Sequence, residues 1–543
     1  MPPTASGNKS INLKRIYKVL LLVRLCFALF GPGYIHPDEH YQNGEVIAGR
    51  QLGVFTARTW EWEPDFACRS IITPATSTGI PYTMFLRWIW WKPENIRPLV
   101  MFLVERLTFF ILSLTLDHTV CQLVSNPADR LRALVLLASS YVMHTFQVRP
   151  FSNSIEAIIV AMSLSSYKSL IETEWNRSLG TFSPDLISLA IYCVMGVFTR
   201  PTFLAFILPV GVQTLVWTYH HASYATLGQP RRAFWAFWLR LVGMPVAAMA
   251  MYTLCFSFVD TVFFREGLSG WVFTPLNFLR YNLSSSNLAD HGLHPRWLHL
   301  LVNLPLIVGP GLLYYGIRAT RQLWSPLPTP LISEKSEKET SLVAQTHVFK
   351  MPLFVIVSSV AILSAFRHQE PRFLVPLLVP FIALIAEGSQ LKRLGSLFWI
   401  SWIVSNVILA TLFGVLHQGG VVPSLINMHD RLGALSHNAP PELTEPSLAW
   451  STGRHVASGK YVLSDLTGIP SEEMLERVVD TQAQETFLRG CFELQERFFP
   501  HLDLDHVPEA MALGWKEGMS LGIYSVDMTC LRSESVPVKQ GKE

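Results

Sequence analysis

The sequence predicts an all-α polytopic membrane protein, and its composition and its apolar runs both support that fold class. Half of the 543 residues are hydrophobic, while charged residues make up 15%, against about 25% in a typical soluble domain. The mean hydropathy is +0.30. Many apolar runs approach the roughly 20 residues that a helix needs to cross a bilayer. The net charge of +3 gives no sign of a nucleic-acid partner.

Eleven apolar segments are candidate membrane-spanning helices. Eight are well supported, and the remainder are short or carry charges such as Arg24, Glu105, Arg106 and Glu156. The segments are 16–35, 99–122, 131–147, 151–170, 184–199, 201–219, 233–260, 298–317, 351–367, 373–387 and 397–416. We therefore expect one membrane domain of 8–11 helices over residues 16–416.

Basic residues in short loops predict the orientation of these helices, because Lys and Arg are retained on the cytosolic side. The N-terminus, residues 1–15, is basic, and with eleven spans every loop expected on its side is also basic. We therefore expect a cytosolic N-terminus. The loops 36–98 and 261–297 and a C-terminal tail domain, 417–543, are then expected to face the lumen.

The tail is long enough for a small domain of its own. Its two cysteines, Cys491 and Cys530, either form a disulfide on an oxidising lumenal side or remain free thiols. The seven cysteines of the chain include no C-x-x-C pair, so neither a zinc site nor a redox motif is indicated.

The run His36-Pro-Asp-Glu-His-Tyr-Gln42 directly follows the first apolar segment. Carboxylates at the membrane edge are costly unless they are paired or face water. Asp38 and Glu39, flanked by His36 and His40, are therefore candidates for a general base beside a lipid-borne substrate. A solvated loop with a turn at Pro37 explains this run about equally well.

Other polar clusters fall on the same predicted side. Arginine is the expected side chain for a phosphate, because its planar fork forms charge-assisted bidentate hydrogen bonds. A single arginine at a helix end is more often a headgroup anchor, but several clusters beside a carboxylate pair indicate a site for a phosphate-linked lipid. The candidate binding residues are Glu61, Arg69, Arg149, Asn153, His291, His294, Arg296, His368 and Arg372.

Two further expectations concern modification and metals. Asn282 begins an Asn-Leu-Ser glycosylation signal on the predicted lumenal side. No cluster of candidate ligands calls for a metal, so we expect neither a metal nor a cofactor.

Over residues 16–420 the chain resembles the dolichyl-phosphate-mannose-dependent mannosyltransferases of the endoplasmic reticulum, glycosyltransferase family 22, which have the GT-C fold. The motifs that carry the resemblance are His36–Gln42, Trp60-Glu-Trp62, Arg69-Ser70, Arg149–Glu156 and His368–Leu374. The resemblance implies a GT-C-type helix bundle in the endoplasmic reticulum membrane with a lumenal active site. It also implies an inverting transfer from dolichyl phosphate mannose, with Asp38 favoured as the base and Glu39 as an orienting group.

Within the family, the His-Pro-Asp-Glu form and the stretch from Asn287 to His299 resemble the enzymes that add the fourth mannose of the GPI anchor. This implies an α-1,2-linked mannose added to the third mannose of a GPI glycolipid acceptor. The alternatives are a third-mannose GPI transferase or an N-glycan mannosyltransferase on the same scaffold. Outside enzymes, the alternative is a transporter or scramblase of lipid-linked sugars, with charged residues along a path through the membrane.

Overall fold

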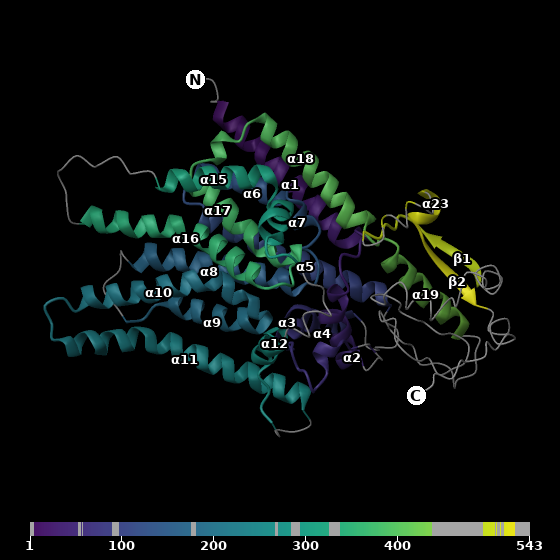
Figure 1. Cartoon of the computed structure of the whole chain (residues 1–543), viewed down its shortest axis with the longest axis horizontal. Coiled ribbons are helices and arrows are strands. Elements are labelled where there is room, and N and C mark those ends of the chain that lie inside the picture. Colours follow the sequence, from purple (N-terminus) through teal and green to yellow (C-terminus); the bar gives the residue numbers. More distant parts are fainter. Residues whose placement is uncertain are drawn as a thin grey trace.

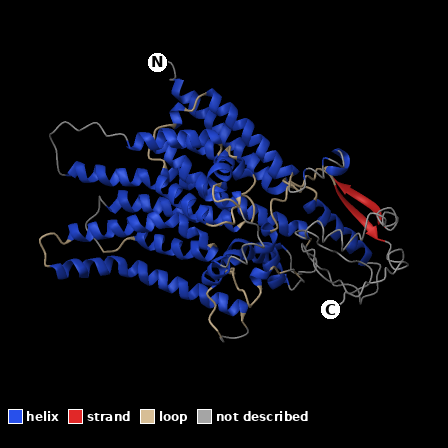
Figure 2. Ribbon diagram, in the orientation of Figure 1, coloured by secondary structure: helices blue, strands red, loops and turns tan. Residues whose placement is uncertain are grey.

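The structure is a computed structural model in which helices form nearly all regular structure (Figure 1, Figure 2). This confirms the predicted all-helical class. The residues it describes are 5–52, 56, 58–89, 97–174, 181–265, 270–283, 294–324, 337–436, 492–504, 507, 511 and 515–526.

The α-helices are α1 (Ala5–Phe30), α2 (Glu45–Leu52), α3 (Ile72–Pro74), α4 (Ile80–Ile89), α5 (Pro98–Leu123), α6 (Pro127–Ala138), α7 (Tyr141–His144), α8 (Ser152–Glu174), α9 (Pro184–Thr199), α10 (Leu204–Ala225), α11 (Arg231–Phe264), α12 (Thr274–Leu283), α14 (Leu304–Val308), α15 (Pro310–Trp324), α16 (Glu337–Ala365), α17 (Leu378–Glu387), α18 (Ser396–Thr411), α19 (Val421–Ser436) and α23 (Trp515–Gly518). The π and 3-10 turns are η1 (His40–Gly44), η2 (Trp60–Trp62), η3 (Ala75–Gly79), η5 (Pro201–Phe203), η6 (His299–Asn303), η7 (Pro371–Leu377), η8 (Leu391–Arg393) and η9 (Leu412–Leu416). Proline occupies the first turn of several helices, where its missing N–H costs nothing.

All eleven apolar segments are helical, but they differ in length and continuity. Among the described residues, five helices are long and apolar enough to span a membrane: α5, α8, α10 with η5, α11, and α18 with η9. A sixth candidate is the pair η6–α14 and α15, bent by 104°. The bend lies at Gly309, whose φ of +77° is readily adopted only by glycine. The chain is therefore a membrane protein, and the total of 8–11 spans stays a prediction.

The segment 131–147 is two helices rather than one. α6 ends at Ala138 and the four-residue α7 follows. Twelve residues of α-helix extend about 18 Å, which is short of a hydrocarbon core of roughly 30 Å. Five of the last six residues of α6 are buried against other helices, so α6 packs inside the bundle and cannot cross it alone.

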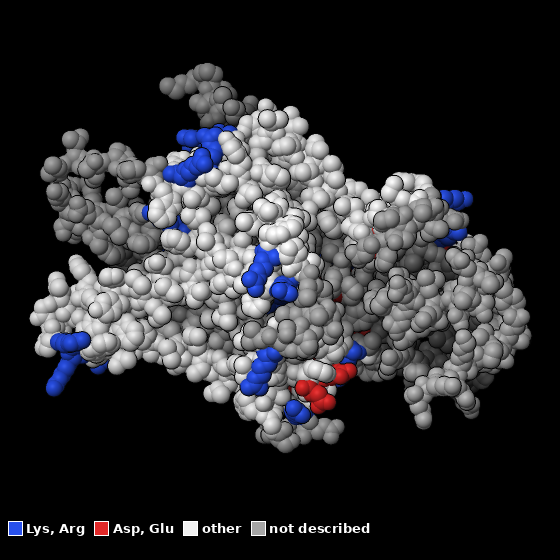
Figure 3. All heavy atoms as spheres, in the orientation of Figure 1, with Lys and Arg blue, Asp and Glu red and all other residues white. Residues whose placement is uncertain are grey.

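The outer helices present apolar side chains to their surroundings. On α11, Met244, Val246, Met251 and Leu254 are each at least half exposed, and the same holds for Leu397 and Ile400 on α18. Figure 3 shows a stretch of surface without charged side chains over the middle of the long helices, with Lys and Arg toward their ends. This is the surface expected of helices in lipid.

Inside the bundle, α17 is buried along almost its whole length. A buried ion pair joins α1 to α5, since Arg24 donates to Asp117 Oδ2 over 2.6 Å and to Oδ1 over 3.2 Å. Neither side chain is more than 5% exposed, so each charge depends on the other for compensation. Arg24 was the charge that made the first apolar segment a poor candidate for a membrane span, and Asp117 neutralises it inside the bundle.

The connections lie at two opposite ends of the bundle, as Figure 1 shows. At one end, the chain after α1 pairs with the end of α18, because the N–H of Gly33 donates to the carbonyl of Gly414. At the other end, Lys392 lies 3.7 Å from Asp129 and Lys168 lies 4.0 Å from Glu387. Lys168 and Lys392, both predicted to be on the cytosolic side, therefore lie at this second end.

In the tail, β1 (Phe492–Phe498) and β2 (Leu521–Val526) pair antiparallel, with Phe492 opposite Val526 and a bulge between Leu494 and Glu496. A bridge between His417 and Leu502 connects this part of the tail to the end of α18. The cysteine pair proposed for the tail, Cys491 and Cys530, lies outside the described residues.

Candidate active site

The carboxylate of Asp38 is held by an arginine from a distant part of the sequence. Arg372 donates from Nη1 to Asp38 Oδ2 over 2.7 Å, and its Nη2 lies 3.5 Å from His36 Nε2. The Asp38 side chain is 22% exposed, so part of it remains open to a substrate. Burial opposes its ionisation, but Arg372 and His36 outweigh burial and hold the pKa of Asp38 well below its usual range. Asp38 is therefore ionised at neutral pH.

Arg372 is itself fixed by a second carboxylate. Glu370 accepts from Arg372 Nε and, over 3.0 Å, from Nη2, while His368 Nε2 lies 2.8 Å from Glu370 Oε1. Despite burial, Arg372 and His368 hold the pKa of Glu370 far below its usual value. All three nitrogens of the Arg372 guanidinium are thereby engaged by protein groups.

Glu39 has a different environment from its neighbour. It is fully buried and accepts from Arg106 and, over 2.9 Å, from Arg149 Nη1. Arg149 also donates to the carbonyl of Gly33. Burial opposes ionisation of Glu39, but the two arginines outweigh it and lower its pKa. This geometry makes Glu39 the counter-ion of two buried arginines and gives it no open face.

His40 packs under this network. Its ring stacks on Tyr34 with centroids 5.5 Å apart, and burial lowers the pKa of His40 to about 4. His40 is therefore neutral at physiological pH and adds no charge beside Glu39.

A second network starts in the loop before α3. Arg69 donates from Nε to Glu61 Oε1 over 2.9 Å, and Gln42 donates to Glu61 Oε2 over 3.1 Å. Gln42 Oε1 accepts from Ser152 over 3.3 Å, and Ser152 accepts from Arg200 Nη1 over 2.9 Å. Loop 36–98 and the starts of α8 and α10 therefore meet in one buried hydrogen-bonded chain.

Two more polar residues extend this chain at the start of α8. Glu156 accepts from Thr202 over 2.8 Å and lies 3.7 Å from Arg200 Nε. Asn153 Nδ2 is 3.5 Å from Glu156 Oε2. Asn153, a candidate from the sequence, thus contacts a carboxylate that the sequence suggested only as a charge at the start of a span.

The candidates from loop 261–297 are more scattered. His294 Nδ1 accepts from the N–H of Gln369 over 3.3 Å, whereas the Arg296 side chain is exposed and only its carbonyl contacts Gln369. His291 lies outside the described residues. Asn282 lies in α12 and donates to the carbonyl of Phe278 over 2.9 Å, and its glycosylation stays a prediction.

The sequence placed Arg200 and Gln369 within two polar clusters on the predicted lumenal side, 199–202 and 367–373, but gave neither residue a role, and it marked Arg106 only as a charge inside an apolar segment. Gln369 is buried and receives the N–H of His299 over 2.8 Å, while its amide donates to the carbonyl of Phe366 over 2.9 Å. The signal for Arg106 was available, since a charge inside an apolar segment is rare and needs a partner. Nothing in the sequence around Gln369 indicates its role, because that role depends on which residues it contacts in the folded chain.

The described residues contain no group of three or more His, Cys, Asp or Glu that could hold a metal ion. The prediction of no metal and no cofactor remains one for experiment.

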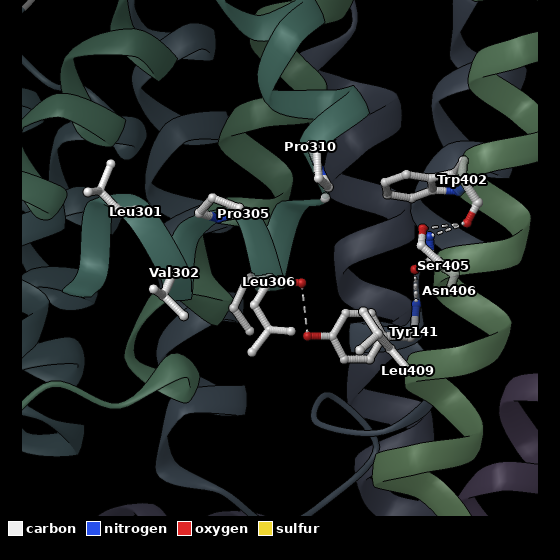
Figure 4. Close-up of a pocket in the computed structure, with 12 residues that line it drawn as sticks. Tyr141, Leu301, Val302, Pro305, Leu306, Pro310, Trp402, Ser405, Asn406 and Leu409 are labelled. Atoms are coloured by element: carbon white, nitrogen blue, oxygen red, sulfur yellow. Dashed lines mark hydrogen bonds between the residues drawn. The ribbon is translucent and has the colours of Figure 1, made fainter. Parts of the chain in front are cut away.

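A cavity of about 360 Å³ lies apart from these networks, between the bent pair η6–α14 and α15 on one side and α18 on the other (Figure 4). Tyr141 crosses it, with its hydroxyl donating to the carbonyl of Leu306 over 3.1 Å and its N–H to Asn406 over 2.6 Å. The lining is mostly apolar and suits a hydrocarbon chain better than a charged group.

The fold and the site together define a polytopic membrane protein with a carboxylate–arginine centre at one end of its helix bundle. Residues 15–443 match the Alg9-like mannosyltransferase family, and the chain belongs to that family. This confirms the family resemblance seen in the sequence.

Individual relatives carry more specific names. The chain is 33% identical to GPI mannosyltransferase 4 of Emericella nidulans, over 90% of this chain and 86% of the relative. It is 34% identical to human GPI alpha-1,2-mannosyltransferase 4, over 77% and 72% of the two chains, and 32% identical to GPI mannosyltransferase 4 of Saccharomyces cerevisiae, over 73% and 68%. Among solved structures, ArnT of Cupriavidus metallidurans bound to undecaprenyl phosphate aligns with a TM-score of 0.47 and 14% identity, over 80% and 70%.

Proposed function

We propose that this chain adds the fourth mannose of the GPI anchor, by transferring an α-1,2-linked mannose from dolichyl phosphate mannose to the third mannose of the GPI precursor. The names of the relatives that match most of its length support this acceptor. We further propose that the site faces the lumen of the endoplasmic reticulum, which the basic loops at the opposite end of the bundle favour.

The observation that carries the mechanism is the half-open carboxylate of Asp38 on Arg372. In the proposed step the acceptor hydroxyl attacks the anomeric carbon, its proton passes to Asp38, and the bond to the phosphate oxygen breaks. The phosphate keeps the electron pair, so no acid is needed to protonate it. The hydroxyl becomes acidic as its new C–O bond forms, and a carboxylate of low pKa is then a sufficient base.

The other residues have supporting roles in this mechanism. Glu39 fixes Arg106 and Arg149 beneath the base. Glu370 and His368 orient Arg372, and the network of Glu61, Arg69 and Asn153 borders the space in which substrate groups would lie. His36 and His294 stand beside the two loops that contribute Asp38 and Arg372. Direct substrate contacts by Arg296 and His291 remain part of the proposal, whereas the buried Arg149 would act through Glu39.

The test uses purified full-length protein with dolichyl phosphate mannose and defined GPI acceptors. We expect transfer to a three-mannose GPI acceptor and none to a two-mannose one. Transfer to the two-mannose acceptor would identify a third-mannose enzyme, and transfer only to an N-glycan precursor would identify that branch. Movement of lipid across vesicle membranes without any transfer would identify a transporter.

A further inference from the structure

Two buried guanidinium groups near Asp38 keep N–H donors that no described residue accepts. Nη1 of Arg69 is buried without a hydrogen-bond partner. Arg200 is only 2% exposed, and it donates from Nε to Thr202 and from Nη1 to Ser152. No hydrogen bond from its Nη2 joins it to the described part of the chain. An unpaired buried donor carries a desolvation cost that a ligand oxygen removes.

The two groups are held at a fixed separation. The hydrogen-bonded chain from Arg200 through Ser152, Gln42 and Glu61 ends at Arg69, with each link between 2.9 and 3.3 Å. Thr73 and Thr199, which follow Arg69 and precede Arg200, are also joined, by a 2.9 Å hydrogen bond between their hydroxyls. This chain of hydrogen bonds therefore fixes the positions of the two arginines relative to each other.

Of the arginines that the sequence favoured for a phosphate, Arg149 and Arg372 are bound to the carboxylates of the base motif, as is the buried Arg106. Arg372 is shared between Asp38 and Glu370. Arg149 and Arg106 surround Glu39, and each is only 1% exposed. Every nitrogen of the Arg372 guanidinium is engaged. Arg106 keeps Nε and Nη1 and Arg149 keeps Nε without a hydrogen-bond partner, but Glu39 already compensates the charge of both groups.

Arg200 lies close to the arginine that holds the base. The guanidinium carbons of Arg200 and Arg372 lie 5.1 and 5.8 Å from the centroid of Phe373, so both pack against one ring. In an inverting displacement the attacking and leaving oxygens occupy opposite faces of the anomeric carbon. Arg372 is bound to Asp38, the proposed base, and therefore lies on the side of the attacking oxygen. The leaving phosphate, on the opposite side, requires a different cation.

Electrostatics support the same assignment. Burial and the nearby charge of Arg69 lower the pKa of Arg200 to about 10. Arg200 therefore stays protonated at neutral pH, and an anion between the two cations would reduce their repulsion. Glu61 and Glu156 each contact one of the two arginines from the side and orient their planar forks.

We propose that Arg69 and Arg200 form the binding site for the phosphate of the lipid-linked donor. The proposal rests on the proposed function and assigns one substrate group to two residues. As the bond to the anomeric carbon breaks, the phosphate changes from a singly charged diester to a monoester with a second negative charge. Donors fixed beside it bind the charge that develops in the transition state more strongly than the starting diester.

The experiment measures binding without transfer. Full-length protein in lipid nanodiscs is titrated with radiolabelled dolichyl phosphate, and uncharged dolichol is the reference ligand. We expect the wild type to prefer dolichyl phosphate and Arg69→Gln and Arg200→Gln to lose at least ~10-fold in its affinity, as the loss of a charge-assisted hydrogen bond implies. Arg265→Gln, an exposed arginine after α11, is the matched control and should bind like the wild type.

A second comparison separates the phosphate site from the base. Arg372→Gln should keep dolichyl phosphate affinity within about 3-fold while losing transfer, since its partners are Asp38 and Glu370. If instead Arg372→Gln loses affinity for dolichyl phosphate while Arg69→Gln and Arg200→Gln keep it, the phosphate is bound elsewhere than proposed. The proposed donor would still be correct. A wild type without preference for dolichyl phosphate over dolichol would contradict the proposed function itself. If Arg200→Gln does not fold, the proposal is tested with Arg69→Gln and Arg200→Lys instead. Wild-type affinity for dolichyl phosphate in both of these variants would overturn it.

Discussion

Arg372 Nη1 donates a 2.7 Å hydrogen bond to Asp38 Oδ2, between residues 334 positions apart in the sequence. The pair joins the loop after α1 to the turn η7, near the two ends of the membrane domain.

Replacement of Asp38 by Asn should abolish transfer without loss of protein. The change is nearly isosteric and removes only the ability to accept a proton, and general-base assistance is typically worth roughly 10²–10⁴-fold. We expect transfer to fall at least ~100-fold at a normal membrane level of the variant. Normal transfer by a stable Asp38→Asn variant would remove Asp38 from the reaction.

Replacement of Glu39 by Gln should act through stability. It would leave Arg106 and Arg149 buried around a neutral group, and removing one partner of a buried ion pair typically costs roughly 3–5 kcal/mol. We expect a lower thermal unfolding midpoint in detergent, with the folded fraction retaining more activity than Asp38→Asn. An unchanged midpoint together with a lost kcat would show that Glu39 takes part in the chemistry.

The pH profile should report on Arg372. This arginine lowers the pKa of Asp38, so its removal should raise that pKa and move the acid limb of kcat/KM to higher pH. In Arg372→Gln we expect activity to be weak and to decline as the pH falls through a range in which the wild-type profile is still flat. Arg372→Lys should preserve more of the profile but lose rate, because it keeps the charge without the planar fork. Coincident acid limbs would separate Arg372 from the ionisation of Asp38.

Gln369 should behave as a positioning residue. Its amide ties the loop at 294–299 to the end of α16, one residue before Glu370. Gln369→Ala should lower kcat more than it changes the KM of either substrate, and Gln369→Glu should recover part of it by keeping the acceptor for His299. The exposed Gln229→Ala is the matched control. Equal losses in kcat for the Glu and Ala variants, with a reduced unfolding temperature, would indicate a purely structural role.

Orientation can be tested with glycosylation tags. A tag inserted in the tail, 417–543, should be modified in microsomes, and one at the N-terminus should remain unmodified. An unmodified tail tag that a protease reaches from the cytosolic side would reverse the proposed topology. Glycosylation of Asn282 itself can be measured in the same experiment, as a change in electrophoretic mobility of the untagged protein.

The sequence was sufficient to predict the helices, since each apolar segment is helical, and the motifs indicated the family. It could not predict that adjacent carboxylates have different environments. Asp38 and Glu39 are both acidic residues in the same motif, and only the position of α5 beside the loop after α1 encloses Glu39 with Arg106. The break at Ser139 and Ser140 in segment 131–147 was equally hidden, because both helices on either side are apolar.

The same limit applies to Arg200 and Gln369. Each stands in a short turn between apolar segments, where a polar residue is ordinary. Their importance arises from partners far along the chain, such as Ser152 for Arg200 and His299 for Gln369. Such partnerships depend on helix packing, which hydrophobic periodicity alone does not specify.

The buried pair of Arg24 and Asp117 also constrains how the protein is made. The two residues are 93 positions apart, so at a synthesis rate of about 5–20 residues per second Arg24 precedes Asp117 by roughly 5–19 s. During that interval α1 contains a charge that disfavours insertion by roughly 2.5–3.5 kcal/mol at a helix centre. Arg24 gains its counter-charge only when α5 has been synthesised. The ion pair that joins the first helix to the bundle can therefore form only after α5 has been synthesised.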